Sequence, residues 1–467
     1  MLCVVAPSSQ KSYLDYTFSV IFDEWLGLDY QVAYTSIDNI EIRLSSEDDG
    51  AINFDTSFLN VLTRDSLSET ALMQFSYNTL RYTPYESLVG SLRLNKLEQD
   101  DVPVFFGKAN ISVGPKITVE FDLFGTIFFM LSRFEELLNP VRDKHNRFPA
   151  RESLAYKHSF LERPIVDEYV EILWACLKKL WPNLERKKHE PEMFVSCDVD
   201  IPFDPSARSI YQLVRTCFAD LVKRRSPATA IRRLRCYICN KKGDFRFDPN
   251  YTFDFYMDAC EQAGLKAAFY FIPTSAEPGN GCYELNDPAI RDLLKKIDQR
   301  GHEIGVHGSY QTYQDGEKLI KQKQVLDEAL VGLNIKQKVR GNRQHYLRWD
   351  SEVTPDLLDA AGFQYDSTGG YADHAGFRFG TCHEFSMWSW AKKKKLNLKQ
   401  RPLVVMECSV IDAQYMGLGN GRDARAFMDF LKFTCVLQRG SFTLLWHNSS
   451  LASERDQTLF LGLVLSE

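Results

Sequence analysis

The sequence predicts an α/β protein with a mainly parallel β-sheet, open or closed into a barrel, preceded by a separate α+β domain. From residue 253 onward, apolar strand-like runs alternate with helical stretches of ten or more residues. This alternation indicates βα units and a parallel sheet. A charged stretch with a proline, Glu185–Pro191, comes before this part and has the composition of a linker. We therefore expect an N-terminal domain over residues 1–190 and a C-terminal domain over residues 191–467.

The N-terminal domain is predicted to begin with a strand and to end with an amphipathic helix. The expected strands cover residues 1–7, 44–59 and 102–121, and the expected helices cover residues 123–138 and 165–180. The arginine-rich segment 142–159 is predicted to be a solvated loop, and the alternative is a site for an acidic substrate or a lipid head group. No residues of this domain have the pattern of a catalytic site.

The C-terminal domain is predicted to begin with a buried strand that ends near Val195. Residues 206–243 are rich in arginine and lysine and are predicted to form an amphipathic helical excursion over a phosphate-bearing or lipid-linked substrate. Cys236 and Cys239 lie in this excursion without the second pair that a zinc finger needs. The further strands are expected at 266–272, 302–307, 339–341, 363–366, 403–407 and 442–446, and the helices at 253–262, 287–300, 316–331 and 351–360.

Composition excludes several classes of protein. A net charge of −6 argues against a general nucleic-acid binder. Eleven scattered cysteines indicate a reduced, intracellular setting rather than a disulfide framework. The apolar run after Met1 lacks the basic residues and the length of a secretory signal, and the apolar stretch 123–131 is too short to span a bilayer. We expect a cytoplasmic protein without an integral membrane segment.

Ionisable side chains stand where five of the predicted parallel strands end, which is the edge at which α/β proteins build their sites. They are Asp198, Asp200, His307, Arg343, His345, Asp366 and His447. Asp198 and Asp200 are two residues apart on a strand, so both carboxylates face one spot and need a cation or divided roles. A carboxylate with imidazoles suits zinc or a similar divalent metal, with one position open for water. A second carboxylate can take the proton of that water and a histidine can protonate the leaving group, which is the chemistry of amide or ester hydrolysis.

These motifs resemble those of the polysaccharide deacetylases, metal-dependent carbohydrate deacetylases of the carbohydrate esterase family 4 type with a distorted (β/α) barrel. The resemblance covers about residues 192–467, and its motifs are Ser196–Asp200, Gly301–Tyr310, Gly341–Trp349 and Leu444–Asn448. It implies that Asp198 is the general base, Asp200 and His307 are metal ligands, Arg343 orients the base and His447 is the general acid. The N-terminal half resembles the companion domain that precedes the barrel in some bacterial members, and no activity follows from that.

The chain departs from the family pattern at the second metal histidine, where it has Gln311. Glutamine is a poor zinc ligand. Either His345 completes the site, or Gln311 binds weakly, or two side chains and waters hold the metal, and we favour His345. Asp366 and Arg378 are further candidates for orienting Arg343 or His447.

The resemblance implies a hydrolase that removes an acetyl group from an N-acetylated sugar or a polysaccharide precursor, with zinc as its cofactor and a carbohydrate as its substrate. Because the expected protein is cytoplasmic, the substrate would be a nucleotide- or lipid-linked precursor. Two alternatives share these residues: a barrel that has lost its metal and binds a glycan or a partner protein, and a hydrolase of a non-sugar amide C–N bond. The departure at Gln311 favours the first alternative, and the retained acids and histidines argue against it.

Overall fold

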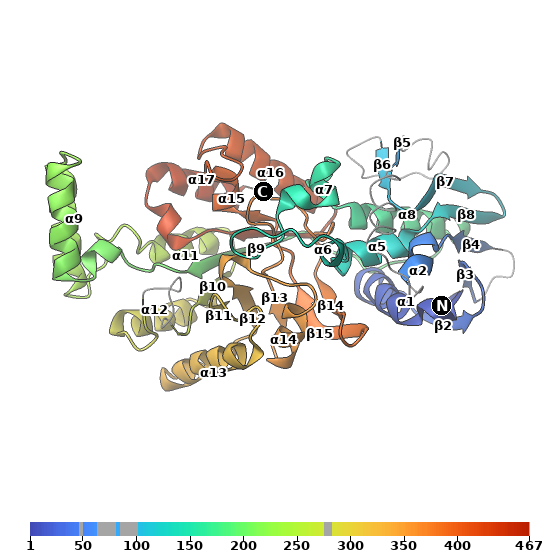
Figure 1. Cartoon of the computed structure of the whole chain (residues 1–467), viewed down its shortest axis with the longest axis horizontal. Helices are drawn as coiled ribbons and strands as arrows, with labels where there is room; N and C mark the ends of the chain where they lie inside the picture. The colour runs from blue at the N-terminus through green and yellow to red at the C-terminus, as the bar shows by residue number, and fades with distance from the viewer. Residues whose placement is uncertain (46–49, 63–80, 85–100, 275–282, 467) are drawn as a thin grey trace.

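The computed structural model describes residues 1–45, 50–62, 81–84, 101–274 and 283–466. It is a mixed α/β structure with two large sheets that come from separate stretches of the chain, residues 2–121 and 192–445 (Figure 1). The first sheet lies at one end of the molecule, the second lies in the middle, and a pair of helices stands at the opposite end (Figure 1).

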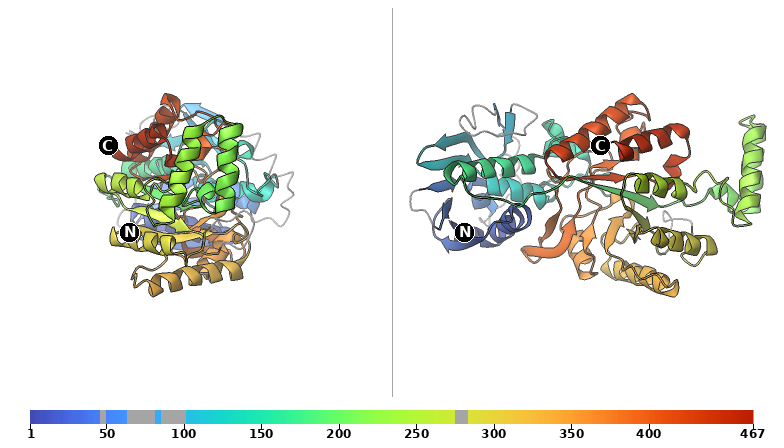
Figure 2. Two further views of the ribbon diagram at one scale, coloured as in Figure 1. Left: turned by 90° about the vertical axis from the view of Figure 1, so that its left-hand side faces the viewer. Right: turned by 180° about the vertical axis from the view of Figure 1, so that it is seen from behind.

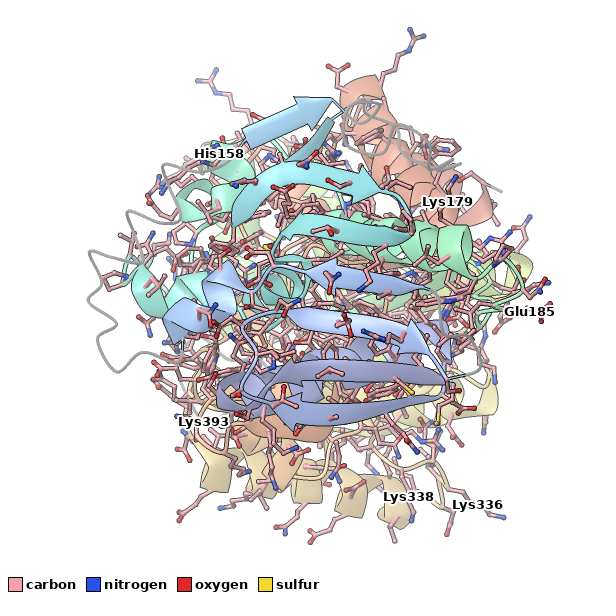
Figure 3. All side chains as sticks on the ribbon, turned by 90° about the vertical axis from the view of Figure 1, so that its right-hand side faces the viewer. His158, Lys179, Glu185, Lys336, Lys338 and Lys393 are labelled. Atoms are coloured by element: carbon pink, nitrogen blue, oxygen red, sulfur yellow. The ribbon has the colours of Figure 1, made fainter. Side chains whose placement is uncertain are left out.

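The N-terminal sheet is mixed, with the strand order β2-β1-β3-β4-β8-β7. One face is exposed and the helices lie behind the other, as the view onto the sheet in Figure 3 shows. The strands of this sheet are β1 (Leu2–Pro7), β2 (Tyr30–Thr35), β3 (Ile40–Leu44), β4 (Ala51–Phe54), β7 (Gly107–Val113) and β8 (Lys116–Phe121), and β5 (Arg81–Pro84) pairs with β6 (Asp101–Val104) separately. The helices are η1 (Ser8–Gln10), α1 (Lys11–Phe18), η2 (Ser19–Leu26), α2 (Ser57–Leu62), α5 (Leu123–Leu131), α6 (Glu135–Leu138), η3 (Ala150–Glu152), α7 (Leu154–Lys157) and α8 (Ile165–Leu180).

Two N-terminal predictions need correction. The strand expected over residues 44–59 is only partly present, because residues 46–49 lie outside the described part and residues 57–62 form a helix. The Asp122 carboxylate accepts hydrogen bonds from the backbone nitrogens of Phe58 and Leu59 at the start of this helix, a tertiary cap that local sequence cannot reveal. The helix expected over residues 123–138 is broken at Arg133, whose φ is 56°. The guanidinium of Arg133 is buried among Glu135, Glu136 and the carbonyl of Arg378.

The C-terminal sheet has nine strands in the order β14-β15-β13-β12-β11-β10-β9-β17-β16. All neighbours are parallel except β14 and β15. The strands are β9 (Glu192–Val199), β10 (Ala267–Phe271), β11 (Glu303–Gly308), β12 (Gly341–Gln344), β13 (Tyr365–Asp366), β14 (Phe385–Ser389), β15 (Lys394–Gln400), β16 (Val405–Met406) and β17 (Ser441–Leu445). This succession of parallel strands confirms the α/β class. Among the described residues β14 and β16 are its two ends, so closure into a barrel is not confirmed.

Helices surround this sheet (Figure 1). They are η4 (Pro205–Ala207), α9 (Ile210–Val222), α10 (Pro227–Asn240), α11 (Phe253–Gln262), α12 (Pro288–Gln299), α13 (Gly316–Gly332), η5 (His345–Leu347), α14 (Thr354–Ala360), α15 (Glu407–Ile411), α16 (Arg422–Leu437), η6 (Asn448–Leu451) and α17 (Glu454–Leu465). The sequence did not predict the β14–β15 hairpin, α16 or α17. Several bounds were also displaced: α14 begins at Thr354 instead of residue 351, and Glu407 begins a helix instead of ending a strand.

The predicted helical excursion is confirmed as a hairpin of α9 and α10. The two helices stand side by side and project from the rest of the chain (Figure 2). Cys236 and Cys239 both lie in α10 as free thiols.

One cluster of buried apolar side chains includes residues of both sheets and of the helices around them. The division of the chain at residues 190 and 191 therefore stays a prediction. Among the described residues, no helix has both the length and the apolar character that a bilayer crossing requires.

Candidate metal centre

The structure brings six of the seven residues predicted at strand ends together at the carboxyl ends of neighbouring strands, and Asp366 is described below. Asp198 lies at the end of β9, His307 lies on β11 and Arg343 lies on β12. Asp200 and His345 directly follow β9 and β12, and His447 is the second residue after the end of β17. Because β17, β9, β10, β11 and β12 are successive neighbours in the sheet, these side chains meet above one edge of it.

Asp200 lies between two imidazoles. Its Oδ1 is 3.2 Å from Nε2 of His307 and 3.5 Å from Nε2 of His345. One ligand atom from each of the three residues lies within 4.8 Å of the other two. Two ligands bound about 2.0–2.1 Å from a tetrahedral zinc ion lie about 3.3 Å apart. The spacing of this group, the Asp200 triad, therefore suits a small divalent cation.

Neighbouring groups orient the ligand atoms of the triad and leave two of them without a hydrogen-bond partner. Nδ1 of His307 is 2.9 Å from the backbone carbonyl of Arg343, so this nitrogen donates its proton there and Nε2 faces Asp200. Nε2 of His307 and Oδ1 of Asp200 are both buried and have no hydrogen-bond partner. Burial opposes the charge of Asp200, but His345 and His307 outweigh it and hold the pKa of this carboxyl well below its usual range. When His307 is neutral, its Nε2 and Oδ1 of Asp200 are two facing buried acceptors, and a cation placed between them would satisfy both.

Strands β11 and β12 pack closely next to the triad, at Gly308 and Gln344. A Cβ atom on Gly308, the residue after His307, would lie 2.5 Å from Oε1 of Gln344. The Gln344 amide accepts a hydrogen bond from Oγ1 of Thr312 at 2.6 Å and is fully buried. Glycine at position 308 thus lets β11 and β12 approach each other and fixes the position of His307.

Asp198 stands beside the triad rather than in it. Its Oδ2 is 3.8 Å from Nε2 of His307, and its Oδ1 is 3.7 Å from Nη1 of Arg343. Arg343 is fully buried, and its Nη2 donates to the hydroxyls of Ser196 at 3.1 Å and Ser367 at 3.0 Å. Arg343 is therefore a fixed cation that stabilises the negative charge of Asp198.

His447 lies on the other side of Asp200, with its Nε2 3.6 Å from Oδ2 of that aspartate. Its Nδ1 is 2.7 Å from Oε1 of Glu407. Burial favours the neutral ring, but Glu407 and then Asp200 outweigh it and raise the pKa of His447 to about 10. In the absence of a cation, His447 is thus protonated at neutral pH, with Nε2–H directed into the site.

A loop from the N-terminal half supports the triad. Tyr346 and Leu347 follow His345 with φ angles of 61° and 55°, a conformation that costs non-glycine residues energy. The ring of His145 stacks on Tyr346 at 4.6 Å, and Nη1 of Arg147 donates to the Tyr346 carbonyl at 2.9 Å. Segment 142–159, which was predicted to be a solvated loop, therefore packs against the site. One of its basic side chains, Arg147, is buried there.

The structure also gives the positions of three other candidates from the sequence. Asp366 does not bond to Arg343 or His447; its Oδ1 accepts from Asn342 and Thr368. Arg378 forms a two-pronged ion pair with Glu136, away from both residues it was expected to orient. Gln311 is exposed in the turn after β11, whereas His345 stands in the triad.

Sequence reasoning missed Glu407 and His145. Glu407 could have been found, because it follows the predicted strand 403–407 at the same edge of the sheet as the other site residues. No local pattern indicated His145, which reaches the site only through the tertiary fold.

Two further groups have metal-ligand spacing: Glu407 with Cys408 and His447, and Asp167 with Cys382 and His383. In the first, Oε1 of Glu407 accepts both of its hydrogen bonds from His447, and Oε2 is buried without a partner. In the second, Asp167 accepts from Thr381 and from the backbone nitrogen of Cys382. Among these three groups of described residues, the Asp200 triad is the one in which two atoms without a hydrogen-bond partner, Oδ1 of Asp200 and Nε2 of His307, lie 3.2 Å apart.

Comparison with known proteins gives three findings. A family of unknown function (DUF7033) matches residues 2–182. No curated protein matches the chain. Among solved structures, a protein from Mycobacterium smegmatis assigned as a polysaccharide deacetylase has 15% identity and a TM-score of 0.39, covering 60% of this chain and 84% of its own. The PuuE allantoinase has 12% identity, a TM-score of 0.34 and coverages of 58% and 83%. A protein from Pseudomonas aeruginosa PAO1, also assigned as a polysaccharide deacetylase, has 14% identity, a TM-score of 0.34 and coverages of 58% and 83%.

Proposed function

We propose that this protein is a metal-dependent hydrolase that removes an acetyl group from an N-acetylated sugar. One observation carries the proposal: the buried, facing acceptor atoms of Asp200 and His307, with His345 beside them and with Asp198 and His447 on either side. A cation site flanked by one carboxylate and one imidazole has the parts that amide hydrolysis requires.

Asp200, His307 and His345 would hold the metal. A divalent cation bound there, zinc by the choice of ligands, supplies Lewis acidity that polarises an amide carbonyl and makes water a stronger acid. His307 is fixed for this role by the hydrogen bond from its Nδ1 to the Arg343 carbonyl.

Asp198 acts as the general base and takes the proton of the attacking water. Its Oδ2 is 3.8 Å from Nε2 of His307 in the triad, and its Oδ1 is 3.7 Å from Nη1 of Arg343 on the opposite side. Arg343 cannot turn away, because both Ser196 and Ser367 accept from the same guanidinium nitrogen.

His447 acts as the general acid that protonates the departing amine. Glu407 fixes Nδ1, which leaves Nε2–H as the proton that the ring can transfer. A cation at Asp200 offsets part of that carboxylate's effect and brings the pKa of His447 down from about 10 toward the working range of an acid catalyst.

The test measures metal content and acetate release together. The purified protein is expected to hold about one equivalent of a divalent transition metal and to release acetate from N-acetylated sugars. Asp200→Asn and His307→Ala should lose the metal, whereas Asp198→Asn and His447→Ala should keep the metal and lose activity by about 100-fold or more.

Undiminished activity in Asp198→Asn and His447→Ala would refute the mechanism. A protein without metal that gains no activity from added zinc or cobalt would favour a binding role. Activity confined to non-sugar amides would keep the mechanism and replace the substrate class.

A further inference from the structure

The hairpin of α9 and α10 has no part in the chemistry proposed above, yet it carries an unusual concentration of exposed apolar side chains. Nine of the twenty-one exposed large apolar residues of the described chain lie on it: Ile210, Tyr211, Val214, Phe218, Leu221, Val222, Ile231, Leu234 and Ile238. On α10 they recur at positions 231, 234 and 238, and on α9 at positions 211, 214, 218, 221 and 222. Both spacings place apolar residues along one face of each helix.

The same segment is strongly cationic in a chain whose net charge is −6. The basic residues are Arg208, Arg215, Lys223, Arg224, Arg225, Arg232, Arg233, Arg235, Lys241 and Lys242, and all except Arg233 are exposed. The one acid between residues 207 and 242 is Asp220, which is fully buried and bonded to Arg224 and Arg233. The surface of the hairpin therefore offers apolar side chains with positive charge around them and no exposed acid.

The hairpin is a rigid element despite its projection from the body. Arg233 on α10 donates to Asp220 on α9 at 2.6 Å, which joins the two helices. At its base the rings of Phe203, Phe245 and Tyr251 stack on one another at centroid distances of 4.8 to 5.9 Å. The hairpin thus projects from the body of the protein on a packed base (Figure 2).

We propose that the α9–α10 hairpin docks this protein onto the surface of a bilayer that contains anionic lipids. Exposed apolar side chains enter the interface while the surrounding Arg and Lys side chains bind lipid head groups, the arrangement by which amphipathic helices lie on membranes. Helices of 13 and 14 residues are about 20 Å long, less than the roughly 30 Å hydrocarbon core, so they lie in the interface and do not cross it. Seven of the nine side chains are aliphatic, which argues against a single-stranded nucleic acid, since its bases stack on aromatic side chains.

The hairpin is connected to the metal centre through both of its stems. Nδ2 of Asn448, the residue after His447, donates to the carbonyls of Ile201 at 3.0 Å and Asn250 at 2.8 Å. Ile201 directly follows Asp200. A docked hairpin therefore holds the site at a fixed position relative to the lipid surface, whatever reaction the site catalyses.

Vesicle flotation of the full chain tests the proposal without reference to activity. The wild type is expected to float with vesicles of phosphatidylcholine containing about 30% phosphatidylglycerol and not with pure phosphatidylcholine, and high salt should weaken the binding. The double variant Phe218→Ser/Ile231→Ser should lower the partition coefficient about ten-fold or more. Arg215→Gln and Arg232→Gln should each lower it about five-fold.

Matched controls come from exposed positions on other helices. One double variant, Phe433→Ser/Val331→Ser, removes two exposed apolar side chains from other helices. A second, Lys295→Gln/Lys321→Gln, removes two exposed positive charges there. Both should leave vesicle binding unchanged. The proposal is wrong if the wild type does not float at low salt, or if these controls weaken binding as much as the hairpin variants. It is also wrong if the chain sediments as a dimer that Phe218→Ser/Ile231→Ser makes monomeric while no vesicles are bound, since the face would then be an interface between two copies.

Discussion

Glu407 holds His447 through a single carboxylate oxygen that accepts two hydrogen bonds. Oε1 of Glu407 lies 3.1 Å from the backbone nitrogen of His447 and 2.7 Å from its Nδ1. The same carboxylate thus positions the residue and fixes which ring nitrogen faces Asp200. It is also the leading cause of the raised pKa of His447.

Glu407→Gln should shift the alkaline limb of the pH–activity profile to lower pH. His447 must carry its proton to act as the acid, so activity is lost as the pH rises through the pKa of His447. Removing the Glu407 charge lowers that pKa, and the limb follows it by about one unit or more, while kcat falls about ten-fold. Activity measured against pH in both proteins checks this. The exposed Glu352→Gln is the control, and its activity should fall at the same alkaline pH as that of the wild type. If the alkaline limb of Glu407→Gln is also unshifted, His447 is not the general acid.

Arg343→Lys should lower kcat about 100-fold while the metal content stays at the wild-type level. Lysine keeps the charge but cannot reach Ser196, Ser367 and Asp198 together, so the base loses its fixed position. Metal analysis beside steady-state kinetics checks both expectations. The exposed Arg340→Lys is the control. Loss of metal from Arg343→Lys would instead assign Arg343 to holding the triad together.

The residues of the site could be found from the sequence because they obey a rule about strand ends. Asp198, Asp200, His307 and His447 each follow or end an apolar run, and parallel strands gather their carboxyl ends at one edge. His345 was favoured over Gln311 from ligand chemistry alone, and the structure places its Nε2 3.5 Å from Asp200. Its role as a metal ligand stays a prediction that the metal analysis decides.

Features that depend on tertiary contacts were not accessible from the sequence. The helix at Ser57–Leu62 begins where Asp122, more than sixty residues away in the chain, caps it. The break at Arg133 follows from partners on both sides of the predicted linker, Glu136 and the carbonyl of Arg378. Nor does any local period reveal that His145 stacks on Tyr346. The spacing of hydrophobic residues indicates which face of a helix or strand is buried, but not which other residues pack against that face.

His145→Ala should weaken metal binding although His145 is no metal ligand. Its ring stacks on Tyr346, and Tyr346 in turn lies against His345 at a centroid distance of 4.5 Å. Without this support the strained backbone after His345 can relax, so we expect the affinity for zinc to fall about ten-fold. Competition with a chromophoric chelator measures the affinity. The exposed neighbour Lys144→Ala should bind zinc as the wild type does, and equal affinity in His145→Ala would remove the N-terminal loop from the site.

Glu136→Gln should destabilise the protein by about 3–5 kcal/mol, since it leaves two buried guanidinium groups without their shared counter-charge. Glu136 bonds to Nε of Arg133 at 2.8 Å and to Nη2 of Arg378 at 2.8 Å, with all three side chains buried. This contact joins α6 to the segment before β14, so its loss weakens the packing between the N-terminal and C-terminal parts. Urea unfolding measures the effect, and the exposed Glu328→Gln should change the free energy of unfolding by less than about 0.5 kcal/mol.

The difference in the free energy of unfolding between the wild type and Glu136→Gln should become smaller at acid pH. Burial opposes the charge of Glu136, but Arg378 and then Arg133 outweigh it and lower its pKa below the usual value. A carboxyl whose pKa is lowered in the folded state contributes its stability above the unfolded-state pKa and loses it as the pH falls through the folded-state pKa. Urea unfolding of both proteins from neutral pH down to the acid range should therefore show a constant gap that closes only below the unfolded pKa of glutamate, about 4.3. A gap that stays constant down to the lowest pH would mean that lost packing, rather than lost charge, weakens the variant.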